Sequence, residues 1–260
     1  MRKAPDANGD EGRSYRLYGD LAGWWPLISP PEVYELEAAY LGDLLDSGAR
    51  VRVHEVLDLG SGGGHVAVHL KDRFELTLVD LSPDMLAVSR QLNPQCRHRL
   101  GDMRSVRLGR QFDAVLVHDA VDYITSLSGL AQVIGTAFAH CRPGAMALFV
   151  PDYLKDDFAE LTGGGGGGRV TGGRQAAFTE HTWDPDPGDD WVQADYEFSL
   201  RDADGSVELI RESHRLGAFS RDAWLRQIAE AGFEPAAELG GPATPGARPD
   251  HLFAGYRPRG

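Results

Sequence analysis

Apolar stretches and polar turns alternate along the first 150 residues in the order that a parallel α/β sheet requires. From residue 53 to about residue 151, short apolar strands are followed by segments in which apolar residues return every three or four positions. An alternation of strand and helix implies a parallel sheet with helices on its faces. We therefore predict an α/β protein with a Rossmann-like, doubly wound sheet of seven strands.

The pattern changes after the fifth predicted strand, at residues 145–151. Residues 163–168 are all glycine, and so much backbone freedom is costly to order, which predicts a mobile loop. Alternating stretches follow at residues 176–183, 191–200 and 207–216, and an Asp-Gly turn of the hairpin type joins the last two. The sequence therefore predicts an antiparallel β insertion after strand five.

The two ends of the chain complete the predicted organisation. Residues 1–14 are polar and lack the apolar core of a signal peptide, which predicts a disordered tail. A helical pattern occupies residues 33–45, and a capped helix at 220–231 precedes a last strand at 251–256. The predicted parts are the tail (1–14), an N-terminal helical lid (15–50), a Rossmann-like cofactor-binding domain (51–152 and 217–260), and the glycine loop with the insertion, which covers the acceptor site (153–216).

Composition narrows the classes of function. The chain has 260 residues, a net charge of -13 and two cysteines. The acidic balance opposes binding along a nucleic-acid backbone, and two cysteines provide neither a disulfide framework nor zinc spacing, so we expect no metal and a reducing cytoplasm. No run approaches the roughly 20 apolar residues of a membrane span. We expect a small-molecule partner, no nucleic acid and no membrane, and we leave a homodimer open.

The strongest chemical signal is the glycine turn that follows the first strand of the alternating region. The apolar residues around Asp58 run into Gly60, Ser61 and Gly62, where backbone N–H groups can approach a ligand closely. A dinucleotide fingerprint would require glycine at the position of His65. Asp58 would repel a diphosphate but attract an ammonium group. The turn therefore favours a cofactor with an ammonium and a sulfonium over a nicotinamide dinucleotide.

At this point the chain resembles the class I S-adenosylmethionine-dependent methyltransferases of small molecules, in particular the sugar N-methyltransferases of antibiotic biosynthesis. The first family motif is an acidic residue followed by G-x-G-x-G, and residues 80–86 are similar to the second motif. Asp80 comes about 20 residues after the glycines and is placed to accept hydrogen bonds from ribose hydroxyls. Its alternative is a turn-forming acid at the start of the next helix, for which Ser82 is the predicted N-cap and Pro83 the first residue.

The resemblance implies the remaining cofactor contacts. Asp102 and Met103 correspond to the segment that contacts adenine, although Asp102 also suits a polar turn. Tyr18 and Trp24 lie in the region that closes over the cofactor in these enzymes, and Tyr123 follows the fourth strand. The predicted cofactor set is Tyr18, Trp24, Asp58, Gly60, Ser61, Gly62, Asp80, Leu81, Met85, Gly101, Asp102, Met103, His118 and Tyr123.

Methyl transfer from a sulfonium is an in-line displacement, so the enzyme mainly aligns donor and acceptor and excludes water. An amine acceptor needs only to be deprotonated, whereas a hydroxyl gains more from a general base. The candidate catalytic residues are His118, Asp119, Tyr18, His181 and His214, and each histidine has a capping, packing or surface role as its alternative. Residues that suit either an apolar acceptor pocket or sheet packing are Trp183, Trp191, Tyr196 and Phe198.

The predicted function is an S-adenosylmethionine-dependent methyltransferase that modifies N or O of a small molecule in specialised metabolism. Two alternatives stay open: an NAD(P)-dependent oxidoreductase, and a catalytically silent cofactor-binding module.

Overall fold

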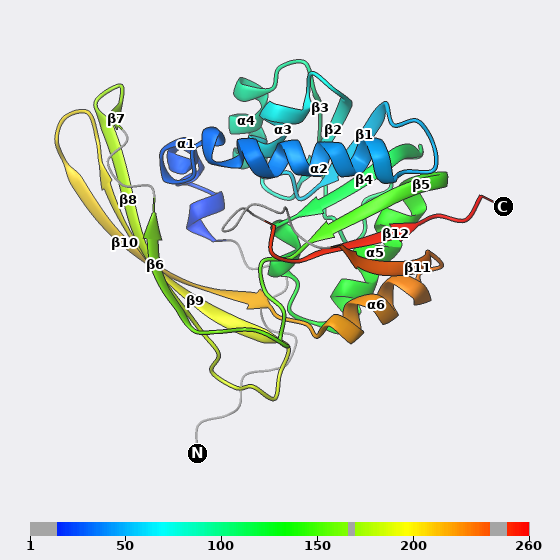
Figure 1. Cartoon of the computed structure of the whole chain (residues 1–260). Coiled ribbons are helices and arrows are strands. Elements are labelled where there is room, and N and C mark those ends of the chain that lie inside the picture. Colours follow the sequence, from blue (N-terminus) through cyan, green and yellow to red (C-terminus); the bar gives the residue numbers. More distant parts are fainter. Residues whose placement is uncertain (1–14, 166–169, 240–248, 260) are drawn as a thin grey trace.

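The computed structural model describes residues 15–165, 170–239 and 249–259, and its centre is a mixed sheet with the strand order β11-β12-β5-β4-β1-β2-β3 (Figure 1). Strands β1 to β5 pair in parallel, and β12 is antiparallel to both of its neighbours. The strands are β1 (Glu55–Leu59), β2 (Glu75–Asp80), β3 (Arg97–Leu100), β4 (Phe112–His118), β5 (Cys141–Val150), β11 (Glu234–Leu239) and β12 (Leu252–Tyr256). The α/β, Rossmann-like class predicted from the sequence is confirmed.

Helices cover both faces of this sheet. Strand residues alternate between the faces, so that Val56 packs with helices α2 (Glu35–Gly48) and α3 (His65–Leu70), whereas Leu57 packs with α5 (Leu127–His140) and α6 (Arg221–Glu230). The N-cap residues Ser82, Ser126 and Ser220 begin α4 (Pro83–Leu92), α5 and α6, and each accepts a backbone N–H of its own first turn. The predicted capped helix starts at Ser82 and Ser220 are therefore confirmed.

The chain reverses direction through the sheet between β1 and β4. It moves from β1 outward to β2 and β3, and then returns to β4 on the other side of β1. The carboxyl ends of these strands meet at one edge, and such a switch point is where ligands bind in open α/β sheets. The residues that end the strands, including Asp80 and His118, are brought together there.

A second sheet stands beside the central one, with the strand order β10-β9-β8-β6 and β7 paired to β8 (Figure 1). All its pairs are antiparallel. The strands are β6 (Leu161–Gly165), β7 (Val170–Thr171), β8 (Arg174–Trp183), β9 (Trp191–Arg201) and β10 (Val207–Gly217). In the sequence they lie between β5 and α6, where the antiparallel insertion is predicted.

The glycine run corrects one prediction. Its first part, residues 163–165, belongs to strand β6 and pairs with β8, rather than forming a mobile loop. A Cβ at Gly164 would lie 2.8 Å from the carbonyl oxygen of Phe178, so the missing side chain lets two backbones approach and their hydrogen bonds offset the cost of order. Residues 166–168 and the predicted tail 1–14 lie outside the described residues.

The N-terminal segment is less regular than the predicted helical lid. Before α2 it consists of short turns of helix: η1 (Arg16–Tyr18), η2 (Ala22–Trp24), α1 (Trp25–Ile28) and η3 (Pro31–Tyr34). It lies between the second sheet and the helices of the central domain (Figure 1). In the part of the chain that is described, no helix is long and apolar enough to cross a membrane.

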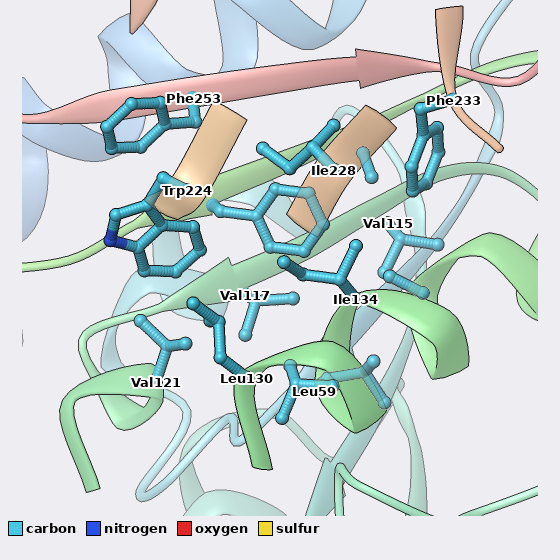
Figure 2. Close-up of a cluster of buried hydrophobic side chains, with 14 of the residues drawn as sticks. Leu59, Val115, Val117, Val121, Leu130, Ile134, Trp224, Ile228, Phe233 and Phe253 are labelled. Carbon is cyan, nitrogen blue, oxygen red and sulfur yellow. The ribbon is translucent and has the colours of Figure 1, made fainter. Parts of the chain in front are cut away.

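The core under α6 gives a test of the fold. Trp224 is 1% exposed and stacks on Phe253, with ring centroids 5.2 Å apart and planes 9° apart (Figure 2). Its Nε1 has no hydrogen-bond partner among the described residues. We expect Trp224→Ala to lower the free energy of unfolding by about 3–5 kcal/mol, and Trp224→Phe to cost less because it also removes a buried, unpaired N–H group.

Urea unfolding of both variants measures these costs. The exposed Arg226→Ala on the same helix is the control and should change stability by less than about 0.5 kcal/mol. A Trp224→Ala variant as stable as this control would contradict the role assigned to the aromatic stack.

Candidate active site

A cavity of about 750 Å³ lies at the switch point, between the central sheet and the second sheet. Its size is within the range of small-molecule and cofactor sites. The central domain contributes Gly60, Ser61, Gly62, Asp80, Leu81, Met85, Gly101, Asp102, Met103, His118, Asp119, Asp122 and Tyr123 to the lining, among others. The N-terminal segment contributes Tyr15, Leu17, Tyr18 and Trp25, and the second sheet contributes Phe178, Glu180, Tyr196, Phe198, Arg215 and Leu216.

Packing within the protein, as well as ligand approach, requires the glycine turn. Gly60 has a φ of 80°, and a Cβ there would lie 2.4 Å from the Cβ of Ala120, which begins the turn of helix η4 (Ala120–Tyr123). Glycine is therefore needed for the left-handed backbone and for the close contact with η4. This contact brings the end of β1 and the residues after β4 together at the cavity wall.

Asp80 joins the glycine turn to the start of α4. Its Oδ2 accepts the N–H of Gly62 at 2.7 Å, and its Oδ1 accepts the N–H of Ser82 at 2.8 Å. Burial raises the pKa of Asp80, while these backbone hydrogen bonds oppose the rise. A carboxylate has about four acceptor sites, so Asp80 keeps capacity for the hydroxyls of a ligand. A cavity with this acceptor beside the apolar Leu81 and Met103 fits a ribose and an adenine ring.

His118 lies in a buried cluster of carboxylates. Its Nε2 is 3.0 Å from Oε1 of Glu37 and 3.3 Å from Oδ1 of Asp119. Burial opposes a charge on His118, but Asp119, Glu37 and Asp58 outweigh it and raise the pKa of His118 to about 9. A pKa above 7 favours the protonated imidazolium form of His118 at neutral pH over the general-base role considered from the sequence.

For two members of this cluster the structure differs from the sequence analysis: Asp58 lies in a different environment from the predicted one, and Glu37 was not identified. Asp58 is 6% exposed and is not among the residues that line the cavity. It lies on the same face of the sheet as His118, and burial raises its pKa to about 7 while the charge of His118 lowers it. The charge of His118 thus acts on Asp58, and the contact of Asp58 with a cofactor ammonium stays a prediction. Glu37 was missed, although a carboxylate among the apolar residues of one helix face is a signal that points to it.

Asp119 is held in an uncommon backbone conformation. It has a φ of 49° and precedes η4. A non-glycine residue with positive φ is strained, and such strain clusters at functional sites. The conformation directs the chain from β4 into η4, so that both Asp119 and Tyr123 line the cavity.

Two tyrosine hydroxyls meet inside the cavity. The Tyr18 hydroxyl is 2.6 Å from that of Tyr123, which is 2.9 Å from Nδ1 of His214. Burial raises the pKa of both tyrosines far above the ordinary value, so both hydroxyls stay protonated at neutral pH. His214 is fully buried and is not among the lining residues, so it contacts the site through Tyr123.

Two other predicted residues lie elsewhere. Trp24 does not line the cavity: the guanidinium of Arg174 lies 3.6 Å from its ring centroid, and Trp25 lines the cavity. His181 points away from the cavity because neighbouring residues of a strand face opposite sides, and it pairs with Glu160 at 2.6 Å. Of the aromatic residues considered for the acceptor pocket, Tyr196 and Phe198 line the cavity, whereas Trp183 and Trp191 do not.

Asp102 lines the cavity but is already engaged by Arg104. Its Oδ2 lies 2.7 Å from Nη2 of Arg104, and its Oδ1 accepts the backbone N–H of Arg104 at 2.8 Å. Burial works against the charged form, but these bonds hold the pKa of Asp102 below its usual value. The carboxylate is thus fixed in a polar turn, and its remaining acceptor sites border the cavity.

Comparison with known proteins agrees with the cofactor predicted for this cavity. Residues 56–144 match the family model of a methyltransferase domain. A dTDP-3-amino-3,6-dideoxy-alpha-D-glucopyranose N,N-dimethyltransferase of Streptomyces fradiae is 28% identical over 247 residues, which are 91% of each chain. These matches, with the fold and the glycine turn, make the chain a methyltransferase with the class I fold.

Solved structures support the same assignment. S-adenosylmethionine-bound CalS10, an amino pentose methyltransferase from Micromonospora echinaspora, is 27% identical, with a TM-score of 0.72 over 86% of this chain and 91% of that one. Streptomyces venezuelae DesVI shares the fold, with a TM-score of 0.76 over 92% of this chain and 97% of that one at 23% identity. The chain is an S-adenosylmethionine-dependent methyltransferase and resembles the sugar N-methyltransferases. This result decides against both alternatives, the oxidoreductase and the silent module.

The charge state of His118 is testable in solution. We expect its imidazole to titrate near pH 9 in the ligand-free protein, and Glu37→Gln to lower that pKa because a carboxylate 3.0 Å away is lost. Since folding raises the pKa from 6.5, the stabilisation from this proton is complete below that pH and is lost as the pH rises through about 9.

An NMR titration of the histidine side chains measures the pKa. Glu35→Gln, an exposed change in the first turn of the same helix, is the control and should leave it unchanged. An ordinary His118 pKa in the unmodified protein would contradict the imidazolium assignment.

Proposed function

We propose that the enzyme transfers a methyl group from S-adenosylmethionine to the amine of a small molecule, an amino sugar of specialised metabolism. The observation that carries the proposal is one cavity in which the glycine turn and Asp80 face carboxylates and aromatic rings supplied by η4 and the second sheet. The relatives named as amino-sugar N-methyltransferases favour the same class of acceptor.

For the cofactor, Asp80 would accept the ribose hydroxyls, and Asp102 with the backbone at Met103 would contact adenine. The turn at Gly60 and Ser61 would lie along the methionine part, and Tyr18 would stand near the sulfonium, where an aromatic ring attracts a cation. S-adenosylmethionine supplies an electrophilic methyl group at its sulfonium.

The acceptor side of the cavity is acidic. Asp122, Asp152 and Glu180 all line it, and the Asp122 carboxylate accepts the N–H of Asp152 at 3.0 Å. Glu180 Oε1 accepts the hydroxyl of Tyr196 at 2.9 Å, which fixes its position on β8. Carboxylates around a cavity raise the local concentration of a cationic acceptor. They support an amine, which reaches the enzyme largely as an ammonium.

The protonation states favour nitrogen over oxygen as the methylated atom. His118 is charged at neutral pH, and Tyr18 and Tyr123 keep their protons, so none of the three is a base. An amine gives its proton to solvent or to a nearby carboxylate, and its lone pair then forms the N–C bond while the C–S bond breaks and its electron pair stays on sulfur. A hydroxyl would need a base of higher pKa to react at a useful rate.

We also propose the division of labour among the parts of the chain. Residues 51–152 and 217–260 hold the cofactor, residues 15–50 close over it, and residues 153–216 select the acceptor. An acidic cavity and a net charge of -13 support a small-molecule acceptor rather than a nucleic acid.

Turnover with methyl-labelled S-adenosylmethionine tests the proposed acceptor. The panel contains amino sugars, free and nucleotide-linked, each beside the matched sugar with a hydroxyl in place of the amine. We expect label only in the amino compounds, at the nitrogen. Label in the hydroxyl compounds at an equal rate would overturn the amine assignment, and comparing free with nucleotide-linked sugars defines the form that is recognised.

The role of Asp80 gives a separate prediction. We expect Asp80→Ala to weaken binding of S-adenosylhomocysteine by about 1–3 kcal/mol, the scale for lost hydrogen bonds to a charged group. Asp80→Asn should lose less, since it keeps one oxygen acceptor. Calorimetric titration measures both, with circular dichroism to confirm folding. Unchanged affinity in a folded Asp80→Ala variant would remove Asp80 from the cofactor site.

A further inference from the structure

Residues 15–28, here called the strap, cross from the second sheet to the central domain. Their apolar side chains pack on the second sheet, in one cluster that contains Leu17, Leu21, Leu27 and Ile28 of the strap with Ala176, Phe198, Leu200 and Ile210 of β8, β9 and β10. Tyr15, Leu17, Tyr18 and Trp25 of the strap line the cavity. The strap is therefore part of the cavity wall, and it lies between the two sheets in Figure 1.

Glu212, on β10, binds the start of the strap. Its Oε1 accepts the N–H of Arg16 at 2.7 Å, and its Oε2 accepts the N–H of Leu17 at 3.0 Å. The first N–H groups of a helical turn have no partner within the turn, and the N-cap residue Tyr15 offers no side-chain hydrogen bond to η1. A side chain from nearly 200 positions later in the chain thus caps η1 with both of its oxygens.

The surroundings of Glu212 keep it charged and fixed. Its side chain is 11% exposed, and Nε2 of His214 lies 3.6 Å from Oε2. Burial works against ionisation, but His214 and the two backbone N–H groups hold the pKa of Glu212 below its usual value. Hydrogen bonds to an ionised acceptor are about twice as strong as those between neutral groups.

The other contacts of the strap connect this cap to the reaction site. The N–H of Arg215 donates to the Tyr15 hydroxyl at 3.3 Å, and the ring centroids of Tyr15 and His214 lie 3.9 Å apart. Further along, Ser82 donates to the carbonyl of Tyr18, beside the Asp80 carboxylate. In this arrangement of the strap the Tyr18 hydroxyl lies 2.6 Å from that of Tyr123.

We propose that Glu212 is a latch: a positioning residue that holds the strap closed over S-adenosylmethionine and sets the rate at which the cofactor is released. The carboxylate does not touch the reacting atoms. It acts through the backbone of residues 16 and 17, which places Leu17 and Tyr18 on the cavity wall. Release of the cofactor follows when these two hydrogen bonds open and the strap leaves the second sheet.

The test replaces Glu212 by glutamine, which has the same shape but only one oxygen, so that its NH₂ group faces an N–H of the strap. Glu208→Gln is the matched control, because Glu208 is an exposed glutamate of the same strand, 3.8 Å from the guanidinium of Arg16. Stopped-flow fluorescence of tryptophan follows dissociation of S-adenosylhomocysteine, which requires no acceptor. The result is therefore independent of the acceptor proposed above.

We expect Glu212→Gln to release S-adenosylhomocysteine about tenfold faster, as the loss of one such hydrogen bond predicts, with the Glu208→Gln rate unchanged. The thermal midpoint without ligand should change little, which separates a latch from a purely structural role. A folded Glu212→Gln variant with the unmodified release rate would overturn the proposal.

Hydrogen exchange of the unmodified protein gives a second test that needs no variant. We expect saturating S-adenosylhomocysteine to slow exchange at the amides of Arg16 and Leu17, because a filled cavity favours the closed strap. Exchange at these amides that is the same with and without the ligand would show that the strap is not coupled to the cofactor, and would equally overturn the proposal.

Discussion

The organisation of the site depends on the carboxylate of Asp80, which accepts backbone N–H groups from Gly62 and Ser82 with separate oxygens. These bonds join the turn after β1, the end of β2 and the first turn of α4. Ser82 in turn donates to the carbonyl of Tyr18, so the same junction reaches the N-terminal strap. Since the parallel strands already bring their carboxyl ends to one edge, a single acid at the end of β2 can join two loops directly and a third segment through Ser82.

Electrostatics divides the cavity into parts with different chemistry. Under the carboxyl end of β4, His118 lies among Glu37, Asp58 and Asp119, and these carboxyl groups raise the pKa of His118, which favours its protonated form over a role as base. The phenols of Tyr18 and Tyr123 stay neutral because burial disfavours the charged phenolate and raises the pKa of both groups. The contributions to catalysis that remain are alignment of donor and acceptor, exclusion of water and attraction of a cation. An amine acceptor can react with these three contributions and no strong base.

The parts of the structure that follow from local sequence could be predicted. Periodicity located the strands, the serine caps located the helix starts, and the spacing from the glycines to Asp80 indicated the cofactor. Predictions that required knowing which face a side chain takes, or which distant segment lies against it, were less successful. Asp58 and His118 share a face with α2, so Glu37 reaches His118, and nothing local to either residue reveals that contact. Trp24 and Trp25 differ by one position, and only the packing of the strap decides that Trp25 lines the cavity.

The same limit explains why the connection between the two sheets was not visible in the sequence. Glu212 reads as one of several charged residues on an amphipathic strand, and the N–H groups that it accepts belong to the backbone, which carries no sequence signal. A carboxylate buried on the side of β10 that faces the strap must nevertheless find donors, since burying an unpaired charge is costly. The start of η1 has N–H groups without local partners. These two unmet requirements satisfy each other, and the two hydrogen bonds join the second sheet to the start of the strap, whose residues Leu17 and Tyr18 line the cavity.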